Sequence, residues 1–417
     1  MTVAVIGAGA SGMVAALEAA WHGAAVTLFE RNSIVGRKLL VTGGGHCNLT
    51  NAGVRGSKYA PLASTAWLDS LFACFGVSDL LALLDEIGVP TYKTSDGWYY
   101  PLSNSAQTVA DAFSSALLQA GVTLRLATQV TSLRTSENGF AVRTSQVGVE
   151  KDEFFAMVIV SAGGKAYPDL GSRGELFPVL ERLGHTALPK RPALAPVLAD
   201  LGALSGLQGL RLDAGVTLWD QKNRLDFAAG NFIFTQFGLN GPAVMDISHA
   251  VSARPGAKLT LSLNLLEFCQ AEFDDLLARK RGTPTPVKVF LGAFFPPKVA
   301  LLYLRLAHLP EDVLLDQVED GALTRLVEKL KDTRLPVKGV RDFEFCQVSA
   351  GGVPVEEVNP QTLESRRVKG LYLTGETLDV VGPCGGYNLQ YAFSSGAVAG
   401  LAASPGIRSG LQKLFRP

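Results

Sequence analysis

The chain has 417 residues, more than one hydrophobic core usually organises, so two or three structural units are expected. Hydrophobic residues make up 47% and charged residues 18%, which is typical of a globular protein and excludes a disordered one. The 38 basic residues equal the 38 acidic residues, so no nucleic acid and no anionic membrane is expected as a partner.

The spacing of cysteines and histidines argues against disulfide, dithiol and metal sites. The five cysteines are scattered and include no C-x-x-C pair, which is typical of a reducing compartment, so we expect a cytoplasmic protein. The five histidines lack metal-ligand spacing, and no metal site is predicted. Residues 380–407 carry no charge, but their glycines and two prolines make poor bilayer composition. We therefore expect them to be buried in protein and no membrane partner.

The first thirty residues carry a dinucleotide-binding pattern. Residues 2–6 (TVAVI) predict a buried parallel strand, and residues 7–12 (GAGASG) match G-x-G-x-x-G. A helix over 13–22 and a second strand over 25–29 follow, and that strand ends at Glu30. Strand, turn, helix, strand and acid in this order predict an adenine dinucleotide site. The pattern does not separate FAD from NAD.

Each residue of this pattern has a physical role. Gly7 permits the tight turn, Gly9 lets a pyrophosphate approach the backbone, and Gly12 lets the helix pack close to the sheet. The helix N-terminus offers free N–H groups and a positive dipole end to phosphates. Glu30 stands where an acid can accept hydrogen bonds from both ribose hydroxyls.

Residues 31–51 form a long glycine-rich and polar segment, and loops of this length in a compact domain are usually functional. Arg37 and Lys38 would supply positive charge near the pyrophosphate. Gly43–Gly45 would permit unusual backbone conformations and close approach to a flat ring.

Helices are predicted over 65–87 and 105–120 from their apolar i, i+3, i+4 spacing. The aromatic stretch 91–101 between them could line a substrate face, but a hairpin packed on the core is the more common outcome. Short strands are expected at 122–127, 130–134, 140–144 and 154–161.

Two positions near these strands are candidate contacts. Val130 stands where adenine-binding domains often use backbone groups to hold the base. Ala162 and Gly163 follow the buried run FFAMVIVS, and ligands of open α/β sheets lie at such carboxyl ends.

From about residue 189 the pattern changes to a mixed β and helical insertion. Alternating stretches at 215–219 and 258–264 predict strands, and 266–281, 298–309 and 323–331 predict helices. The first pattern then resumes with a strand at 370–374, followed by Gly375, Glu376 and Asp379. A final helix over 389–403 carries small residues that allow close packing: Ser394, Ser395, Gly396, Ala397 and Gly400.

Several long motifs resemble the BaiN-like (YhiN-type) family of NAD(P)/FAD-dependent flavoproteins. They are GAGASG with Glu30, GRKLLVTGGGHCNLTN (36–51), SAGGKAYPDLGSRGE (161–175), FTQFGLNGPA (234–243) and the segments between 347 and 400. The chain departs from the family pattern at His46, where many relatives carry arginine, at Ser161 and at Asn240.

The resemblance implies an α/β fold: a discontinuous Rossmann-like FAD-binding domain (1–188 and 346–417) with an inserted β-rich and helical substrate-side domain (189–345). It implies that Asp379 lies near the ribitol or pyrophosphate of FAD. It further implies that Gly385, Gly386 and Asn388 lie at the flavin ring, with the last helix pointing its N-terminus at the ring.

The candidate sites follow from the motifs and the resemblance together. His46 and Tyr387 are the candidate catalytic residues for proton transfer. His46 could equally hold the flavin or the backbone, Tyr387 could equally shield the ring, and Cys47 is expected to be a packing residue. The predicted FAD-binding residues are Gly7, Gly9, Ala10, Ser11, Gly12, Glu30, Arg31, Arg37, Lys38, Gly44, Gly45, Asn48, Val130, Ala162, Gly163, Gly375, Glu376, Asp379, Gly385, Gly386, Tyr387 and Asn388.

The functional hypothesis is an enzyme that transfers hydride between NAD(P)H and a small, fairly apolar unsaturated or carbonyl metabolite through FAD. Only one G-x-G-x-x-G is present, so NAD(P)H is expected to bind transiently. One alternative is an oxygen-using amine oxidase. Another, from a different class, is a flavoprotein that acts on or binds RNA. The oligomeric state is left open.

Overall fold

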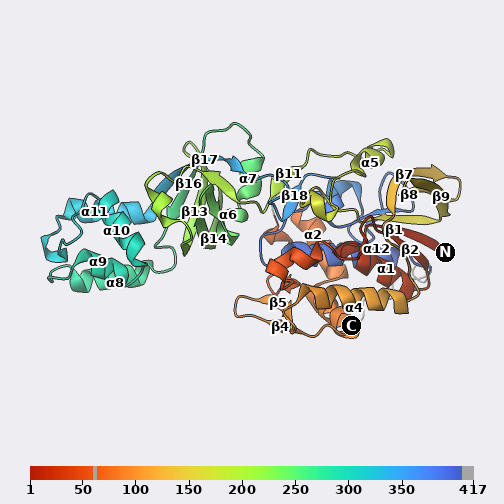
Figure 1. Ribbon diagram of the computed structural model, residues 1–417, viewed down its shortest axis with the longest axis horizontal. Coiled ribbons are helices and arrows are strands. Elements are labelled where there is room, and N and C mark those ends of the chain that lie inside the picture. The colour runs from red at the N-terminus through yellow and green to blue at the C-terminus, as the bar shows by residue number, and fades with distance from the viewer. Residues whose placement is uncertain (60–62, 406–417) are drawn as a thin grey trace. The chain divides into compact units, whose positions relative to one another are not determined.

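The computed structural model describes residues 1–59 and 63–405. It consists of two compact units: unit 1 comprises Met1–Arg191 and Phe343–Pro417, and unit 2 comprises Pro192–Asp342 (Figure 1). Unit 2 is an insertion within unit 1, as the predicted fold class requires. The two units divide at 191/192 and 342/343, whereas the prediction divides the domains at 188/189 and 345/346.

Unit 1 is built on a five-stranded parallel sheet. Apolar runs form its central strands because they are covered on both faces: Val3, Ala4, Val158 and Ile159 are fully buried. The order β19-β10-β1-β2-β6 places the first strand of the chain at the centre. The strands are β1 (Thr2–Ile6), β2 (Ala25–Phe29), β6 (Thr123–Arg125), β10 (Met157–Val160) and β19 (Leu371–Leu373).

The single strand predicted over 154–161 is wrong, because the chain forms two strands there. β9 (Val149–Phe155) belongs to an antiparallel sheet, and β10 of the parallel sheet begins only at Met157. The run FFAMVIVS looks uniformly apolar, yet Phe154 is 71% exposed whereas Val158 is buried. Apolar composition alone could not locate this boundary.

Two helices from opposite ends of the chain pack together through glycine. They are α1 (Ala10–Trp21) and α12 (Tyr387–Ala402). A Cβ atom on Gly396 would lie 2.1 Å from the Ser11 carbonyl oxygen, and one on Gly400 would lie 2.3 Å from the Ala15 oxygen. The predicted close packing of the small-residue helix is confirmed, and it joins the two sequence segments of unit 1.

The helix predicted over 65–87 is broken. α2 (Thr65–Cys74) and α3 (Val77–Glu86) are separated by extended backbone at Phe75 and Gly76. Among the described residues, 65–86 is the one stretch long and apolar enough for a membrane span. Leu68, Leu71, Leu80 and Leu84 of these two helices are buried in the core of unit 1. The next predicted helix is confirmed as α4 (Ala106–Gln119).

Two three-stranded antiparallel sheets complete unit 1. The aromatic stretch 91–101 is a hairpin that pairs with β3, which confirms the predicted hairpin. Trp98, Tyr99 and Tyr100 are only half-buried, so the predicted packing on the core is not confirmed. These sheets consist of β3 (Thr50–Asn51), β5 (Trp98–Pro101) and β4 (Thr91–Lys93), and of β7 (Gln129–Ser136), β8 (Gly139–Gln146) and β9.

Unit 2 contains a closed barrel in the order β12-β15-β14-β13-β16-β17. Along β13, Leu212, Ala214, Val216 and Leu218 are buried in the barrel core, and the residues between them face outward. Its strands are β12 (Val197–Ala199), β13 (Arg211–Asp220), β14 (Asn223–Thr235), β15 (Gly238–Asn240), β16 (Leu259–Asn264) and β17 (Thr333–Val340).

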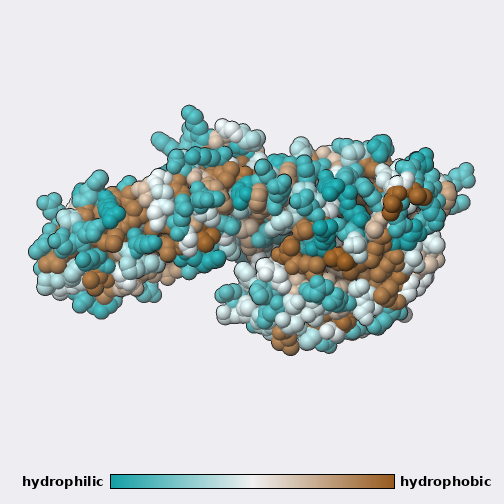
Figure 2. All heavy atoms as spheres, viewed as in Figure 1, coloured by the Kyte–Doolittle hydropathy of each residue, from teal (hydrophilic) through white to brown (hydrophobic). Residues whose placement is uncertain are grey.

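Helices form the rest of unit 2, which confirms a mixed β and helical insertion. They are α6 (Pro242–Met245), α7 (Ser248–Ser252), α8 (Gln270–Lys280), α9 (Val287–Gly292), α10 (Pro297–Leu306) and α11 (Asp320–Lys331). Unit 1 also contains α5 (Phe177–Arg182) and β18 (Val348–Ala350), and β11 (Arg191–Ala193) begins at the last residue of unit 1 and continues into unit 2. On the face drawn in Figure 2, hydrophilic side chains cover much of both units.

Candidate active site

The glycine-rich turn after β1 has two tight positions and one open position. A Cβ atom on Gly7 would lie 2.5 Å from the Ser161 oxygen, and one on Gly12 would lie 1.8 Å from the Gly7 oxygen. Gly7 also has a φ of +99°, which only glycine adopts readily. A Cβ atom on Gly9 would meet no atom within 4 Å. Gly9 therefore leaves space at the N-terminus of α1, where Ala10 is the first helical residue.

Glu30 lies at the end of β2 and is tied to this turn. Its Oε2 accepts a hydrogen bond from the Ala8 N–H (2.8 Å), and its Oε1 accepts from the backbone and side-chain N–H groups of Asn32 (2.8 and 2.7 Å). An ionised carboxylate offers about four acceptor positions. One position is left for a hydroxyl of a ribose, and the carboxylate is already oriented for it.

The three basic residues predicted to bind FAD contact different parts of the protein. Arg37 donates to the Asn32 Oδ1 (2.8 Å), next to Glu30. Arg31 forms an ion pair with Glu175, so its guanidinium holds the 171–175 segment of the protein. Lys38 alone reaches the other sequence half of unit 1, where its Nζ lies 2.5 Å from the Glu376 Oε2.

A second group of predicted residues meets around Glu376. Gly163 (φ +74°) lies close enough that a Cβ there would be 4.0 Å from the Glu376 Oε2. Gly375 (φ +57°) packs against α1, since its Cβ would lie 2.7 Å from the Ser11 Oγ. Ala162, Gly163, Gly375 and Glu376 thus follow the carboxyl ends of β10 and β19. This is the edge of a parallel sheet where ligands bind.

The start of α12 lies against the segment that includes Asn48. A Cβ on Gly386 would lie 2.5 Å from the Thr50 oxygen and 2.8 Å from the Asn48 Oδ1. A Cβ on Gly385 would lie 2.9 Å from the Trp98 ring. Both glycines have positive φ, so only glycine suits this approach. We call Gly7–Gly12, Glu30, Lys38 with Glu376, Asn48 and Gly385–Tyr387 the cofactor cradle.

Asn51 links these segments, and the sequence reasoning missed it. Its Nδ2 donates to the Gly385 oxygen (3.0 Å), and its Oδ1 accepts from the Gly53 N–H (2.7 Å) and the Tyr387 hydroxyl (3.2 Å). Its place at the end of the GGGHCNLTN motif was the available signal. Tyr59 was also missed, and its hydroxyl donates to the Tyr387 oxygen (2.8 Å).

The two candidate catalytic side chains, Tyr387 and His46, differ in their exposure to solvent. Tyr387 is 8% exposed, and its hydroxyl donates to Asn51, which favours a role in holding the helix start. His46 is exposed, and its Nδ1 lies 2.9 Å from the Asn104 oxygen. Because a carbonyl oxygen only accepts, Nδ1 carries a proton and Nε2 is the acceptor nitrogen of the neutral ring.

The segment before His46 has an unusual backbone. Gly43, Gly44 and Gly45 have φ values of +55°, +67° and +93°, so the backbone is kinked and not helical in this part of η1 (Leu39–Gly45). The predicted glycine conformations are therefore present. Cys47 is fully buried, and burial raises the pKa of its thiol to about 12. A thiol of this pKa is not a thiolate at neutral pH, which agrees with the predicted packing role.

Three further predicted residues hold neighbouring backbone. The Asn388 amide accepts from the Gly382 N–H and donates to the Gly382 oxygen, both at 2.8 Å, and so closes the loop before α12. Asp379 is buried, which raises the pKa of its carboxyl, and it accepts from the Gly351 N–H (2.7 Å). Val130 is buried in β7, and the register shifts next to it.

The cradle fits a bound dinucleotide. The Asn48 Oδ1 and the Glu376 Oε1 are buried without a hydrogen-bond partner among residues 1–59 and 63–405. Buried oxygens are normally paired, so both are suited to a ligand that brings donors. Together with the space at Gly9 and the oriented Glu30 carboxylate, they match a long ligand that runs from α1 to α12.

Residues 1–402 match the family model of the HI0933-like protein Rossmann domain. The chain belongs to the HI0933-like family. The match spans both sequence segments of unit 1 and the insertion, which agrees with the Rossmann-like fold. The predicted BaiN-like resemblance is confirmed by this match and by the curated relatives.

Two curated relatives of this HI0933-like protein cover almost the whole chain. A 3-dehydro-bile acid delta(4,6)-reductase of Clostridium scindens is 32% identical over 409 residues, 96% of this chain and 98% of the relative. A ribosomal RNA dihydrouridine synthase of Escherichia coli is 32% identical over 395 residues, 94% of this chain and 95% of the relative.

A solved structure shows the same fold at low identity. It is the 3-ketosteroid-delta4-(5alpha)-dehydrogenase of Rhodococcus jostii RHA1, with a TM-score of 0.54 and 14% identity over 96% of each chain. Membership of this Rossmann flavoprotein family makes the chain a FAD-dependent oxidoreductase.

Proposed function

We propose that this flavoprotein reduces a carbon–carbon double bond conjugated to a carbonyl group, with NAD(P)H as the hydride donor. The observation that carries the proposal is the pair of relatives at 32% identity. The name of one denotes reduction of an unsaturated 3-oxo steroid skeleton, and the other forms dihydrouridine from uridine. In both compounds the double bond that is reduced is polarised by a carbonyl, so the two names describe one reaction type.

Bound FAD supplies two-electron hydride transfer for this reaction. The chain's part is to hold and orient it. Gly9 and the N-terminus of α1 are proposed to bind the pyrophosphate, and Glu30 the ribose. The N-terminus of α12, fixed by Asn51 and Gly386, points a positive dipole end at the proposed place of the ring.

His46 is the proposed source of the proton that completes the reduction. Hydride addition to one carbon of the double bond leaves the other carbon to take a proton. His46 is exposed, and its Nε2 faces no described partner, whereas the Tyr387 hydroxyl is buried and donates to Asn51. An imidazole side chain can carry a proton and donate it to such a carbon.

Anaerobic titration of the purified holoprotein tests the proposal. NADPH or NADH should bleach the flavin absorbance, and 4-androstene-3,17-dione should then restore it with a product two hydrogens heavier. The matched control is the saturated 3,17-dione, which has the carbonyls without the double bond and should restore nothing. His46→Gln should slow this second half-reaction and leave bleaching by NAD(P)H unchanged.

Two outcomes would overturn the proposal. If an amine bleaches the flavin faster than either nicotinamide and oxygen restores it with peroxide, the protein is an amine oxidase. Equal reoxidation by the saturated control would show that the double bond is not the acceptor. A cytoplasmic location remains part of the proposal, since the scattered cysteines suit a reducing compartment.

A further inference from the structure

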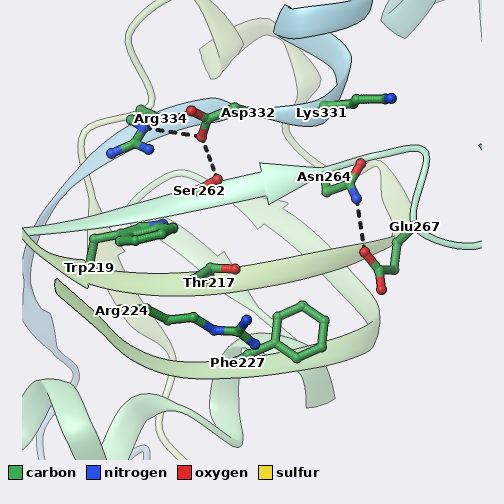
Figure 3. A pocket seen from close by; sticks show the side chains of 10 residues that line it. All are labelled: Thr217, Trp219, Arg224, Phe227, Ser262, Asn264, Glu267, Lys331, Asp332 and Arg334. Atoms are coloured by element: carbon green, nitrogen blue, oxygen red, sulfur yellow. Dashed lines mark hydrogen bonds and ion pairs between the residues drawn. The ribbon is translucent and has the colours of Figure 1, made fainter. Parts of the chain in front are cut away.

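A groove of about 530 Å³ lies on the outer face of the barrel in unit 2 (Figure 3). Its residues come from four adjacent strands, β14, β13, β16 and β17, and from the ends of β16 and α11. No residue of the cofactor cradle belongs to it. Figure 3 shows Thr217 and Ser262 between a lower border of Arg224 and Phe227 and an upper border of Lys331, Asp332 and Arg334.

The strand register explains why these side chains share one face. Along β13 the buried residues alternate with Thr217 and Trp219, which face outward. Thr217 pairs with Phe227 on one side and with Ser262 on the other, and Ser262 pairs with Arg334. One cross-strand row therefore runs across all four strands. Trp219 and its partner Arg224 form the next row.

Aromatic rings and guanidinium groups are stacked at both borders. The Arg334 guanidinium lies 5.2 Å from the centre of the Trp219 ring, and that of Arg224 lies 4.8 Å from the centre of the Phe227 ring. The Trp219 Nε1 is buried and has no hydrogen-bond partner among the described residues. The Trp219 ring is half-buried, and the Arg334 guanidinium over it helps to fix its position.

The charges of the groove are not all compensated within the protein. Asp332 accepts from the Ser262 hydroxyl (2.5 Å) and from Arg334 (2.9 Å), and Glu267 accepts from Asn264 (2.8 Å). Arg224 and Lys331 are exposed and form no ion pair with any residue in 1–59 or 63–405. Two cations therefore remain available beside two aromatic rings.

We propose that this groove binds a segment of single-stranded RNA. Bases stack on aromatic side chains regardless of sequence, and phosphates pair with unneutralised arginine and lysine, which is the combination present here. Between the two borders, the groove also offers the hydroxyl and amide groups of Thr217, Ser262 and Asn264 as hydrogen-bond donors and acceptors. The lining row runs across four adjacent strands on the outer face of the barrel, so it suits a continuous chain rather than an enclosed small molecule.

The equal numbers of basic and acidic residues do not oppose this site. That balance describes the whole chain, whereas the groove carries three cations against two carboxylates that already have partners. RNA binding stands on the groove alone. The further idea that a uracil base of the bound RNA is the compound reduced rests on the proposed function.

Fluorescence anisotropy of the full-length holoprotein with a short labelled oligouridylate tests the site. Wild type should bind at low salt, and its affinity should fall steeply as salt rises. Trp219→Ala should weaken binding about tenfold or more, and Trp219→Phe should retain most of it. The double variant Arg224→Ala/Lys331→Ala should weaken binding and lower the salt slope by about one for each phosphate that it no longer neutralises.

The matched control is Lys288→Ala/Lys298→Ala. Both lysines are exposed on helices of the same unit, so this variant removes the same charge and should bind as wild type does. Equal loss in both double variants would show a general charge effect and overturn the site. No oligouridylate binding by wild type, or competition by UMP as strong as by the oligonucleotide, would overturn it as well.

The same preparations separate this inference from the proposed function. Flavin bleaching by NAD(P)H and reduction of the unsaturated steroid should be unchanged in the groove variants. Oligouridylate binding without any double-bond reduction would leave the groove intact and refute the redox proposal. Double-bond reduction without oligouridylate binding would refute the groove and leave the redox proposal intact.

Discussion

The cofactor cradle of unit 1 and the groove of unit 2 are built by different means. In the cradle, backbone atoms approach so closely that a Cβ on Gly7, Gly12 or Gly386 would overlap a neighbouring oxygen. In the groove, outward side chains of four strands share one face. A site made of close backbone contacts is coupled to folding, whereas a site made of surface side chains is not. Substitutions in the two units test that contrast.

The largest effect is expected for Gly396→Ala. The new Cβ would lie 2.1 Å from the Ser11 oxygen, so α12 must move away from α1. Overpacking costs about 1–3 kcal/mol and occasionally more, and a backbone contact this short belongs at the upper end of that range, above the gain of under about 1 kcal/mol from a better helix former. Urea unfolding of the apoprotein measures this loss in the free energy of unfolding. The variant should also retain less FAD than wild type.

The matched control is Gly321→Ala in α11, where only the Arg325 side chain lies within 4 Å, at 3.8 Å. This change should be neutral or stabilise unit 2 slightly. Similar losses for the two variants would refute the contrast in packing.

The next effect comes from Glu18, which is buried in α1. Burial, with Glu86 and Asp79 nearby, raises the pKa of its carboxyl to about 7 from 4.5. A raised pKa in the folded state stabilises the protein below pH 4.5, and this contribution is lost as the pH rises through about 7. The loss amounts to about 3 kcal/mol.

Calorimetry at a series of pH values measures this effect. The Tm of wild type should fall relative to that of Glu18→Gln as the pH rises from 4.5 through about 7, because the amide stays neutral. Parallel pH profiles for the two proteins would show that Glu18 does not titrate in this range.

A smaller effect on folding, with a clear effect on binding, is expected for Gly9→Ala. The backbone at Gly9 is extended (φ −76°), and a Cβ there meets no protein atom, so the unfolding free energy should change by under about 1 kcal/mol. The same Cβ would occupy the space proposed for the pyrophosphate. Isothermal titration of the apoprotein with FAD should show about tenfold weaker binding or more. Unchanged FAD affinity would place the pyrophosphate elsewhere.

The smallest effect on stability is expected in the groove. Arg224 and Lys331 are exposed, and neither forms an ion pair with a described residue. Replacing both with alanine should shift the unfolding free energy by under about 0.5 kcal/mol. A large loss of Tm would mean that these side chains support the barrel, and the groove would then resemble the cradle after all.

Local patterns predicted much of unit 1. The strand TVAVI, the turn GAGASG and the helix after it are specified within a few residues of sequence, because β-branched runs, glycine spacing and helix starts act locally. The inserted unit was also visible as a change in pattern. Two features were not visible in the sequence: the break at Phe75 and Gly76, and the division of FFAMVIVS into β9 and β10. In both cases the residues on either side have the same apolar character.

The sequence by itself determined a dinucleotide-binding pattern at the start of the chain, and its resemblance to a known family implied that glycines near residue 385 lie at the cofactor. Only the tertiary structure decided which side chains serve it. Asn51, Tyr59 and Asn388 act through hydrogen bonds to backbone far away or across a loop. The groove depends on strand register, which brings Phe227, Thr217, Ser262 and Arg334 into one row. Register joins residues more than a hundred positions apart, and no local pattern encodes it.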